Sequence, residues 1–571
     1  MISRRDLLAL SPLAFASCAR SQEAYFGNTR PPQAQRLTLV LEGEPESLDP
    51  AIPNGMLDPL ILSLFEALTS LHPVTGRPMA SLATHYETTA DALRYTFFLR
   101  GHPAPRGVRL PGTASLPQEY SRGRSEPDPA IRARWSDGRY ITAADFVFGW
   151  QRLLDPATAA IRAFLLYVVR NGRAVNAGKA PPSSLAVRAL DDLTLEVDLE
   201  EPASYFLELV SNRITSAVPE HLIRAAGPRW TEPGVMISSG AFKLRSRRPY
   251  DSVIIERNPM YYDAAQVALS QITFLVPREN ATTVNLYRAG AVSAVQPMLP
   301  AILPVLRRKK DFHPQPLYAS SFIAMNTTAP PFDDVRVRYA FNMATDKQPV
   351  RELLDAGNMP ATSVIPPGAS YQPARSLPVE VGGREYDVLA FNPEAAREIL
   401  RATGKPLPAR IELFSGNNNT QDLLWAQVLR DQWRQNLGVE TDLVLVDFPT
   451  WVNTMSNGGY RHVSTAGTSA SYLDPVWFLD LFTEHEGYGT HWRDPLYNTM
   501  VAEVKRTTEP GLRIQRLMEC ERRLLRAMPV MPQDYWVNGL LVKPYVRGLG
   551  NNLLDREPLK YVWIDTNWRP S

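Results

Sequence analysis

The chain has 571 residues, 61 of them basic and 59 acidic, so its formal charge is only +2. This balance argues against a protein that binds nucleic acid by neutralising phosphates. A chain of this length exceeds one hydrophobic core, so we expect two to four lobes, and 44% apolar residues are typical of an ordinary globular protein. Two cysteines, Cys18 and Cys520, cannot build a disulfide framework, and Cys520 is expected to be buried on a helix.

The first 18 residues have the anatomy of an export signal. Two arginines at positions 4 and 5 precede an apolar run over residues 7–16, which is too short to span a bilayer. Residues 3–8 resemble a twin-arginine signal. We therefore expect an exported protein, located in the periplasm or the cell envelope. No other segment reaches 18 uninterrupted apolar residues, so no membrane-spanning helix is predicted.

The end of this signal, residues 15–18, resembles a lipobox, with Phe15 where leucine is usual. On this interpretation Cys18 becomes the lipidated first residue of the mature protein and anchors it firmly to a membrane. The alternative is a plain secretory signal that contains an incidental cysteine. Residues 19–35 follow as a predicted tether.

Strand patterns recur along the mature chain. Residues 36–41 alternate in polarity and predict a strand. Residues 185–197 predict a β-hairpin that turns at Asp191-Asp192. Residues 240–244 are predicted to pair with residues 252–257.

Helices are predicted where capping residues precede an apolar period. Residues 330–340 predict a helix with an acidic first turn, as the helix dipole prefers. Asn392 and Pro393 predict the start of another helix, which Gly404 stops.

The most informative stretch covers residues 133–154. Ser136 to Gly138 supply turn chemistry, and Thr142 with Asp145 three residues later matches a capping box. An apolar stripe at helical spacing then predicts a buried helix face: Phe146, Trp150, Leu153 and Leu154.

The phrase W-S-D-G-x-x-x-T-A-x-D-F-V-x-x-W-x-R, from Trp135 to Arg152, closely resembles the oligopeptide-binding proteins of ABC importers, which form extracytoplasmic solute-binding protein family 5. The resemblance runs in order from about residue 36 to about residue 565. Residues 45–50, 258–263 and 330–340 carry further phrases of this kind.

This resemblance implies an α/β fold that is periplasmic-binding-protein-like (type II, cluster C), with two lobes joined by a hinge plus an extra inserted domain. The implied division is as follows: lobe I, residues 36–68, 187–316 and 533–571; inserted domain II, residues 69–186; and lobe III, residues 317–532. Residues 101–132 interrupt the resemblance and are rich in proline, glycine and arginine, so they are predicted to be a surface-loop insertion.

In the family, an extended peptide lies between the lobes and pairs its main chain with strands of the cleft. The resemblance implies two contributing segments here, residues 54–57 and residues 467–474. The candidate ligand-binding residues are Asn54, Met56, Leu57, Gly467, Thr468, Ser469, Ser471 and Asp474.

The chain departs from the family at charged positions. Ser471 stands where peptide-binding relatives carry an aspartate that pairs with the α-ammonium of the ligand, and Thr468 stands where a tryptophan is frequent. Thr465 and Met455 fall where some relatives carry arginines that meet the ligand carboxylate. Three alternatives stay open: the alignment slips by one residue, Asp474 takes over as the anchor, or the ligand lacks a free amino terminus.

A disulfide of some relatives would link the positions of Ala319 and Ser469. Both are non-cysteine residues, which is consistent with this alignment register. Aromatic residues that either pack in the core or line the cleft are Trp425, Trp433, Trp451, Trp477 and Tyr488. His485, Glu486 and His491 do not match metal-ligand spacing and are predicted to lie in a surface loop.

The favoured function is the substrate-binding component of an ABC importer, a monomer that captures an oligopeptide-like solute and delivers it to an inner-membrane permease. No catalytic motif, metal site, cofactor site or nucleic-acid site is predicted. Alternatives are the same receptor for a non-peptide or amino-blocked solute, a ligand sensor, and an exported serine hydrolase. The hydrolase would use Ser471 or Ser469 as nucleophile, but the sequence nominates no base for it.

Overall fold

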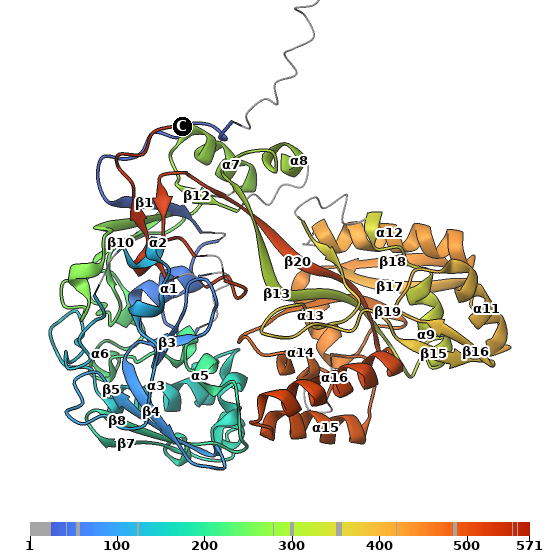
Figure 1. The fold of residues 1–571 in the computed structure, drawn as a ribbon, viewed down its shortest axis with the longest axis horizontal. Coiled ribbons are helices and arrows are strands. Elements are labelled where there is room, and N and C mark those ends of the chain that lie inside the picture. Colours follow the sequence, from blue (N-terminus) through green and yellow to red (C-terminus); the bar gives the residue numbers. More distant parts are fainter. Residues whose placement is uncertain are drawn as a thin grey trace, which may run out of the picture.

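The structure is a computed structural model that describes residues 24–570, apart from residues 42, 53–56, 123–124, 278, 297–301, 350–356, 418–419, 484–487, 551 and 557. The predicted signal and Cys18 therefore lie outside the described residues. Two bodies stand side by side and are connected by the long strands β13 and β20 (Figure 1). In the part of the chain that is described, no helix is long and apolar enough to cross a bilayer.

Lobe I is built on a four-stranded sheet that contains three of the predicted strands. Its order is β1 (Arg36–Val40), β11 (Gln271–Leu275), β10 (Ser252–Arg257) and β9 (Phe242–Arg248). The strand β1 runs parallel to β11, whereas the other neighbours are antiparallel. The predicted pairing of residues 240–244 with residues 252–257 is confirmed for β9 and β10. Lobe I also contains α1 (Asp58–Leu64), α7 (Asn280–Ala289), α8 (Leu303–Leu306), β21 (Val546–Arg547) and β22 (Trp563–Ile564), whereas α6 (Glu220–Ala226) packs against domain II, with Arg224 over the ring of Phe148.

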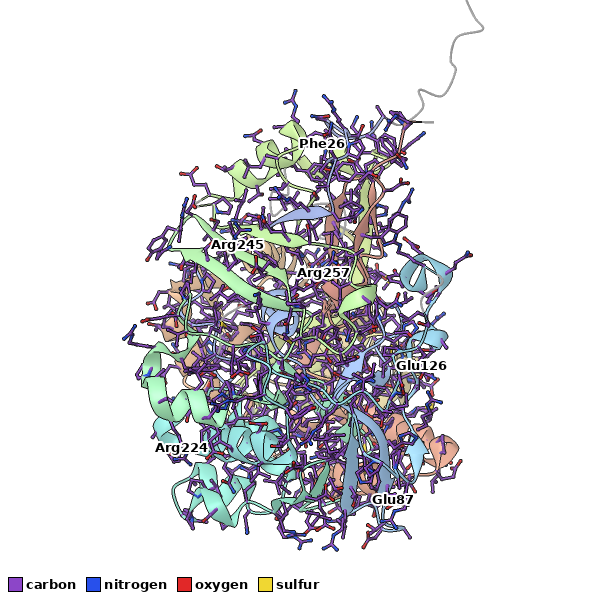
Figure 2. The ribbon with its side chains drawn as sticks, turned by 90° about the vertical axis from the view of Figure 1, so that its left-hand side faces the viewer. Phe26, Glu87, Glu126, Arg224, Arg245 and Arg257 are labelled. Atoms are coloured by element: carbon purple, nitrogen blue, oxygen red, sulfur yellow. The ribbon has the colours of Figure 1, made fainter. Side chains whose placement is uncertain are left out.

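The predicted tether is wrong for its described part, residues 24–35, because this segment is fastened to lobe I. Phe26 is labelled near the top of Figure 2. Its backbone N–H donates to the Asp311 carboxylate at 2.9 Å, and Lys543 Nζ donates to its carbonyl at 3.0 Å. The Gln35 side chain bonds the backbone of Ile564 in both directions. These contacts reach residues near the C-terminus, which the composition of the segment does not reveal.

Domain II is a five-stranded sheet with the order β6 (Val108–Arg109), β4 (Ala83–Thr88), β5 (Arg94–Leu99), β8 (Thr194–Asp198) and β7 (Val187–Asp191). The predicted hairpin at Asp191 is confirmed. Because β8 pairs with β5, however, this hairpin belongs to the domain II sheet, and the boundary set at residue 186 is wrong. Further elements here are β2 (Thr69–Leu71), β3 (Pro78–Ala80), α4 (Gly172–Asn176) and α5 (Phe206–Leu209).

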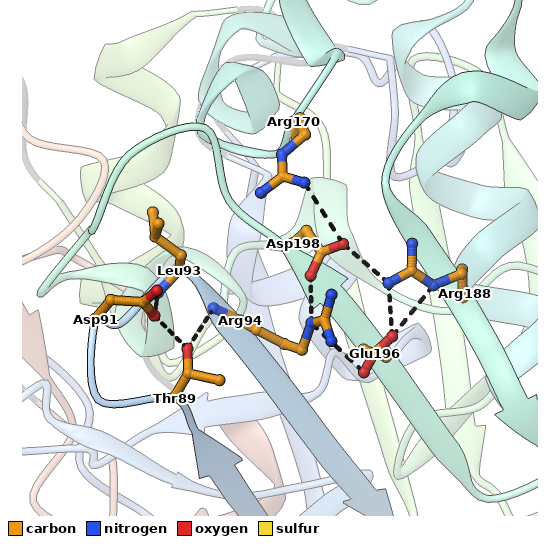
Figure 3. A network of polar contacts seen from close by, with 8 residues as sticks. All are labelled: Thr89, Asp91, Leu93, Arg94, Arg170, Arg188, Glu196 and Asp198. Carbon is orange, nitrogen blue, oxygen red and sulfur yellow. Dashed lines mark hydrogen bonds and ion pairs between the residues drawn. The ribbon is translucent and has the colours of Figure 1, made fainter.

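One face of this sheet is joined by ion pairs across three strands (Figure 3). Arg94 of β5 and Arg188 of β7 both pair with Glu196 and Asp198 of β8, at N–O distances between 2.6 and 3.6 Å. Leu195 and Val197 alternate with these acids and are buried on the opposite face, as the period of a strand requires. The network therefore holds the hairpin to the rest of domain II.

The capped helix predicted after Gly138 is α3 (Ala143–Leu154). Asp145 accepts hydrogen bonds from the Thr142 N–H at 2.8 Å and from the Thr142 hydroxyl at 3.2 Å, which confirms the capping box. The stripe that includes Phe146 and Trp150 is fully buried.

The insertion at residues 101–132 is more than a surface loop. It contributes β6 to the edge of the domain II sheet and contains the short helix α2 (Gln118–Ser121). Leu116 and Tyr120 form a buried cluster with Met79 and Tyr561. Two apolar side chains in a polar segment gave too weak a pattern to predict this packing.

A seven-stranded sheet extends from β12 in lobe I into lobe III, where most of its strands lie (Figure 1). Its path is β12 (Ala294–Val295), β20 (Val530–Val542), β13 (Phe312–Met325), β19 (Val463–Ser469), β17 (Arg410–Gly416) and β18 (Glu440–Val446), and β14 (Met359–Pro360) pairs with β20. The remaining elements are α9 (Val335–Met343), β15 (Pro378–Val381), β16 (Arg384–Asp387), α11 (Pro393–Thr403), α12 (Thr420–Leu437), α13 (Phe448–Asn457), α14 (Val476–Asp480), α15 (Pro495–Arg506) and α16 (Pro510–Ala527).

Several local predictions hold in lobe III. The Asn392 side chain caps α11 and Gly404 ends it in the left-handed region, as predicted. Cys520 is buried on α16. The acidic first turn predicted for α9 is wrong, because Asp334 is the capping residue before the helix.

Trp425 and Trp433 pack in the hydrophobic core of lobe III rather than in a cleft. Both lie on α12, and Trp433 donates from Nε1 to the Thr345 hydroxyl at 3.0 Å.

The strands β13 and β20 cross between the two bodies and pair with each other over most of their length (Figure 1). Their register shifts between Pro316 and Ser320 and again between Ser321 and Phe322. The predicted limits of lobe III, residues 317 and 532, fall inside these two strands. The hydrogen-bonded pairing of the two connecting strands is thus irregular near the predicted start of lobe III.

Candidate ligand-binding site between the lobes

The strand β19 carries the predicted residues Gly467, Thr468 and Ser469. Its antiparallel partner is β13, and Ala319 lies directly opposite Ser469. The two positions that the family resemblance placed next to each other are therefore neighbours in the sheet, which supports the alignment register used for Ser471.

The other edge of β19 is open beyond its first two residues. The Ala470 N–H donates to the Tyr318 carbonyl at 2.9 Å, so the antiparallel alternation turns the main-chain groups of Gly467 and Ser469 away from β13. On that side, β17 pairs with β19 only at Val463 and Ser464. In the described chain no strand continues this ladder, and the Gly467 carbonyl accepts from the Tyr488 hydroxyl.

Gly467 packs closely against its partner strand β13 and against Trp536 of β20. A Cβ atom added there would lie 3.1 Å from Cζ2 of Trp536 and 3.2 Å from the Ser320 carbonyl oxygen. Thr468 is buried, and its hydroxyl accepts from Trp477 Nε1 at 3.3 Å. The threonine thus orients Trp477, one of the aromatic residues that the sequence left undecided.

Ser471 and Asp474 follow β19 and are both buried. The Ser471 carbonyl accepts from Arg556 Nη1 at 2.7 Å. The Asp474 carboxylate accepts from Arg513 Nη2 at 2.9 Å and from the Val476 N–H at 2.9 Å. Asp474 therefore already has a cationic partner inside lobe III, which weakens its candidacy as a replacement anchor for an ammonium group.

The first predicted segment is described only at its end. Asn54 and Met56 lie outside the described residues. Leu57 is buried, precedes α1, and accepts at its carbonyl from the Ile61 N–H at 3.0 Å. Leu57 thereby fixes the position of Asp58, the first residue of the helix.

Asp58 is shared by two arginines from distant parts of the chain. Arg213 Nε donates to Oδ1 at 2.6 Å, and Arg556 Nε donates to Oδ2 at 2.7 Å. Burial raises the pKa of Asp58, but the neighbouring guanidiniums outweigh this effect and hold the pKa below its ordinary value. No sequence motif pointed to this cluster, because its members lie far apart in the chain.

The other positions raised by the sequence are uncharged or lie elsewhere. Thr465 and Met455 are buried, and the Thr465 hydroxyl bonds that of Ser415 at 2.9 Å. Trp451 stacks on Phe448 of α13. His485 and Glu486 lie outside the described residues, and His491 Nε2 lies 2.8 Å from the Gly458 carbonyl.

A cavity of about 330 Å³ lies between domain II and lobe III. Its walls include Phe164, Tyr167 and Tyr205 from domain II, and Tyr472, Trp477 and Lys505 from lobe III. Lys505 Nζ pairs with Asp480 at 2.8 Å and with Glu201 at 3.5 Å, so one cation connects the two sides. The sequence named Trp477 but none of the residues from domain II, since nothing in their local pattern indicates what they face.

The serine hydrolase alternative needs a base next to Ser469 or Ser471. Among the described residues, no histidine or carboxylate bonds either hydroxyl, and Arg556 bonds the carbonyl of Ser471 rather than its hydroxyl. The region offers main-chain groups, aromatic surfaces and buried charges.

Comparison with known proteins places this chain in a family. The model of the bacterial extracellular solute-binding proteins, family 5 (middle region), matches residues 132–490. The chain belongs to this family. Its members are binding proteins, so the chain is a binding protein and not an enzyme, and the predicted family is confirmed.

Individual relatives agree with this assignment. The chain is 31% identical over 582 residues to the periplasmic oligopeptide-binding protein OppA of Salmonella typhimurium, with 99% of each chain covered. It is 29% identical over 521 residues to the probable deoxycholate-binding periplasmic protein YgiS of Escherichia coli, covering 88% of this chain and 89% of YgiS.

The fold has a solved counterpart. The structure of the Escherichia coli murein tripeptide binding protein MppA matches with a TM-score of 0.74 and 26% identity, covering 94% of this chain and 99% of MppA. The predicted α/β fold of the periplasmic-binding-protein type is therefore confirmed.

Proposed function

We propose that this protein is the solute receptor of an ABC importer. It captures a peptide-like solute between its lobes, pairs the main chain of that solute with β19, and delivers it to a permease in the membrane. The named relatives include an oligopeptide-binding and a murein tripeptide binding protein, which supports a peptide as the solute.

The open edge of β19 carries this proposal. Gly467 and Ser469 direct main-chain groups away from β13, at a place where the ladder with β17 has ended. An extended peptide that adds a strand there gains main-chain hydrogen bonds with little demand on its side chains.

Isothermal titration calorimetry with two peptide series tests the proposal. In the first series the side chains vary at constant length, and binding should persist throughout. In the second, single backbone nitrogens are methylated, which removes one donor at a time, and binding should fall by about tenfold at the paired positions. Strict dependence on one side chain, with tolerance of every N-methyl group, would show that main-chain pairing is not the mode of binding.

A second candidate is a receptor or sensor for a non-peptide or amino-blocked solute. It is favoured by the uncharged residues Thr465, Thr468 and Ser471 and by the engagement of Asp474 with Arg513. The similarity to YgiS, named for deoxycholate binding, supports this candidate. A thermal-shift panel of bile acids, sugars, opines and peptides separates the two, because only bound solutes stabilise the fold.

We further propose that the mature protein is a monomer, exported to the periplasm or cell envelope and held there by a lipid on Cys18. The periplasmic relatives and the twin-arginine-like and lipobox-like segments support this location. Separation of the membrane and soluble fractions of cells tests the location and the lipid.

A further inference from the structure

Four aromatic rings form a continuous row along the cavity between domain II and lobe III. Phe164 lies on a short helix over residues 163–168 of domain II, and its ring centroid is 6.4 Å from that of Trp477 in lobe III. The ring of Trp477 in turn lies 5.3 Å from Tyr472, which stacks on Tyr205 of domain II at 4.2 Å. Because the row takes rings from both bodies, the cavity has its full wall only while domain II and lobe III are together.

The polar atoms of two wall residues already have partners inside the protein. Trp477 Nε1 donates to the Thr468 hydroxyl at 3.3 Å. The Tyr167 hydroxyl donates to Asn176 Oδ1 at 2.6 Å. Phe164 has no polar side-chain atom, and 38% of its surface is exposed. These rings therefore offer apolar faces and edges to a group that enters the cavity.

The buried charges of the wall compensate one another. Lys505 Nζ pairs with Asp480 at 2.8 Å and with Glu201 at 3.5 Å, and the lysine side chain is only 13% exposed. The guanidinium group of Arg173 lies 4.7 Å from the centroid of the Tyr167 ring. Since one ammonium group already holds two carboxylates, this cluster favours neither a cation nor an anion of the solute.

The size and position of the cavity suit one large side chain. Its volume is about 330 Å³. A dry cavity of about 150 Å³ holds one benzene molecule, and pockets for complete small ligands begin at about 300 Å³. The cavity also adjoins the open strand, because Trp477 is bonded to Thr468 of β19 and Tyr472 directly follows Ser471. A solute whose main chain pairs with β19 can therefore place a side chain in this space.

We infer that this cavity is a side-chain pocket that binds an aromatic group of the solute. The inference rests on the proposed function and adds a preference to it: β19 binds the main chain, and the cavity selects a ring at one position. The bound ring packs against Phe164 from one body and Trp477 from the other. Because it contacts both bodies at once, it also favours their closed arrangement.

Calorimetry with a peptide scan tests the inference. An all-alanine peptide is compared with peptides that carry a single phenylalanine, leucine or lysine at each position in turn. At one position phenylalanine should raise the affinity at least about tenfold, and more than leucine or lysine does. An equal gain from leucine would show that the pocket does not recognise a ring. A larger gain from lysine would show that the carboxylates of Glu201 and Asp480 determine the preference, and either result overturns the inference.

Two variants remove the pocket from opposite sides. Phe164→Ala deletes the ring of domain II, and Leu481→Trp fills the cavity from the end of α14 in lobe III. In each variant the ratio of the affinities for the phenylalanine and all-alanine peptides should fall to about one. Phe391→Ala is the matched control, because Phe391 is 49% exposed just before α11 and does not line the cavity. The ratio should stay at its wild-type value there.

The failure of this inference differs from the failure of the proposed function. If peptides bind but no position prefers phenylalanine, or if the preference persists in both Phe164→Ala and Leu481→Trp, the aromatic pocket is overturned and main-chain binding stands. If no peptide of the scan binds, including the all-alanine peptide, the proposed function fails as well.

Discussion

The phenol rings of Tyr205 and Tyr472 stack face to face, with centroids 4.2 Å apart and an interplanar angle of 4°. Tyr205 precedes α5 in domain II, and Tyr472 follows Ser471 in lobe III. Both side chains are buried. This contact, together with the pairing of Lys505 with Glu201, connects domain II to the lobe that carries β19. The inserted domain is therefore part of the wall at this end of the cleft.

Replacing Tyr205 with alanine should separate domain II from lobe III. Because the burial and the ring stacking of Tyr205 are lost together, we expect the free energy of unfolding to fall by about 3 kcal/mol. We also expect faster hydrogen exchange of the backbone amides in residues 470–480. Urea unfolding and hydrogen-exchange mass spectrometry measure the two effects. Tyr250→Ala is the control, since Tyr250 is 66% exposed and its loss should change stability by less than about 0.5 kcal/mol. Equal effects of the two variants would contradict the proposed contact.

Asp145, the acid of the capping box, should contribute less to the free energy of unfolding as the pH rises, which is opposite to the usual behaviour of an aspartate. Burial raises its pKa from 3.8 to about 6, against the opposing hydrogen bonds from Thr142. The folded protein then binds this proton more tightly than the unfolded chain, so the contribution of Asp145 to stability falls as pH rises from about 4 to about 6. Asp145→Asn cannot ionise. In urea titrations, the free energy of unfolding of the wild type minus that of this variant should therefore decline as the pH rises from about 4 to about 6. If this difference stays constant over that range, the pKa of Asp145 is not raised.

Ser471→Asp should improve the binding of peptides with free amino termini. The new carboxylate would lie near Arg556, whose Nη1 donates to the carbonyl of residue 471, and would offer a partner to an ammonium group. We expect a gain of about tenfold in titration calorimetry. Ser471→Asn, which has a similar size and no charge, is the matched control. If Asp and Asn variants bind such peptides equally, Ser471 does not occupy the amino-terminal position of the ligand.

Cys18→Ala should release the protein from membranes into the soluble extracytoplasmic fraction. Without its thiol the residue cannot carry a lipid, and the remaining chain contains no other predicted anchor. Immunoblots of separated membrane and soluble fractions of the native host measure the distribution. Cys520→Ala changes the other cysteine, which is buried on α16, and should leave the protein on the membrane. Membrane retention of Cys18→Ala would exclude Cys18 as the lipid site.

The sequence by itself determined the elements whose signals lie within a few residues of each other. The capping box of Thr142 and Asp145, the cap and stop of α11, and the hairpin at Asp191 all formed as predicted. Such features depend on local backbone geometry, which neighbouring side chains largely decide. The long family phrase from Trp135 to Arg152 also sufficed for the family and the general fold. The resemblance around residues 472–479, with the disulfide of some relatives, implied that Ala319 and Ser469 are neighbours, and the two lie opposite each other.

Only the tertiary structure decided which partners the buried charges have. Asp58 meets Arg213 and Arg556 across 155 and 498 positions of the chain, and Asp474 is bonded by Arg513. It also decided that the hairpin at Asp191 joins domain II and that residues 24–35 are fastened to lobe I. A sequence specifies that a residue carries a charge or an apolar surface, but the partner that compensates it is selected by the packing of distant segments. For that reason the sequence located the open strand β19 and could not reveal the arginines beside its end.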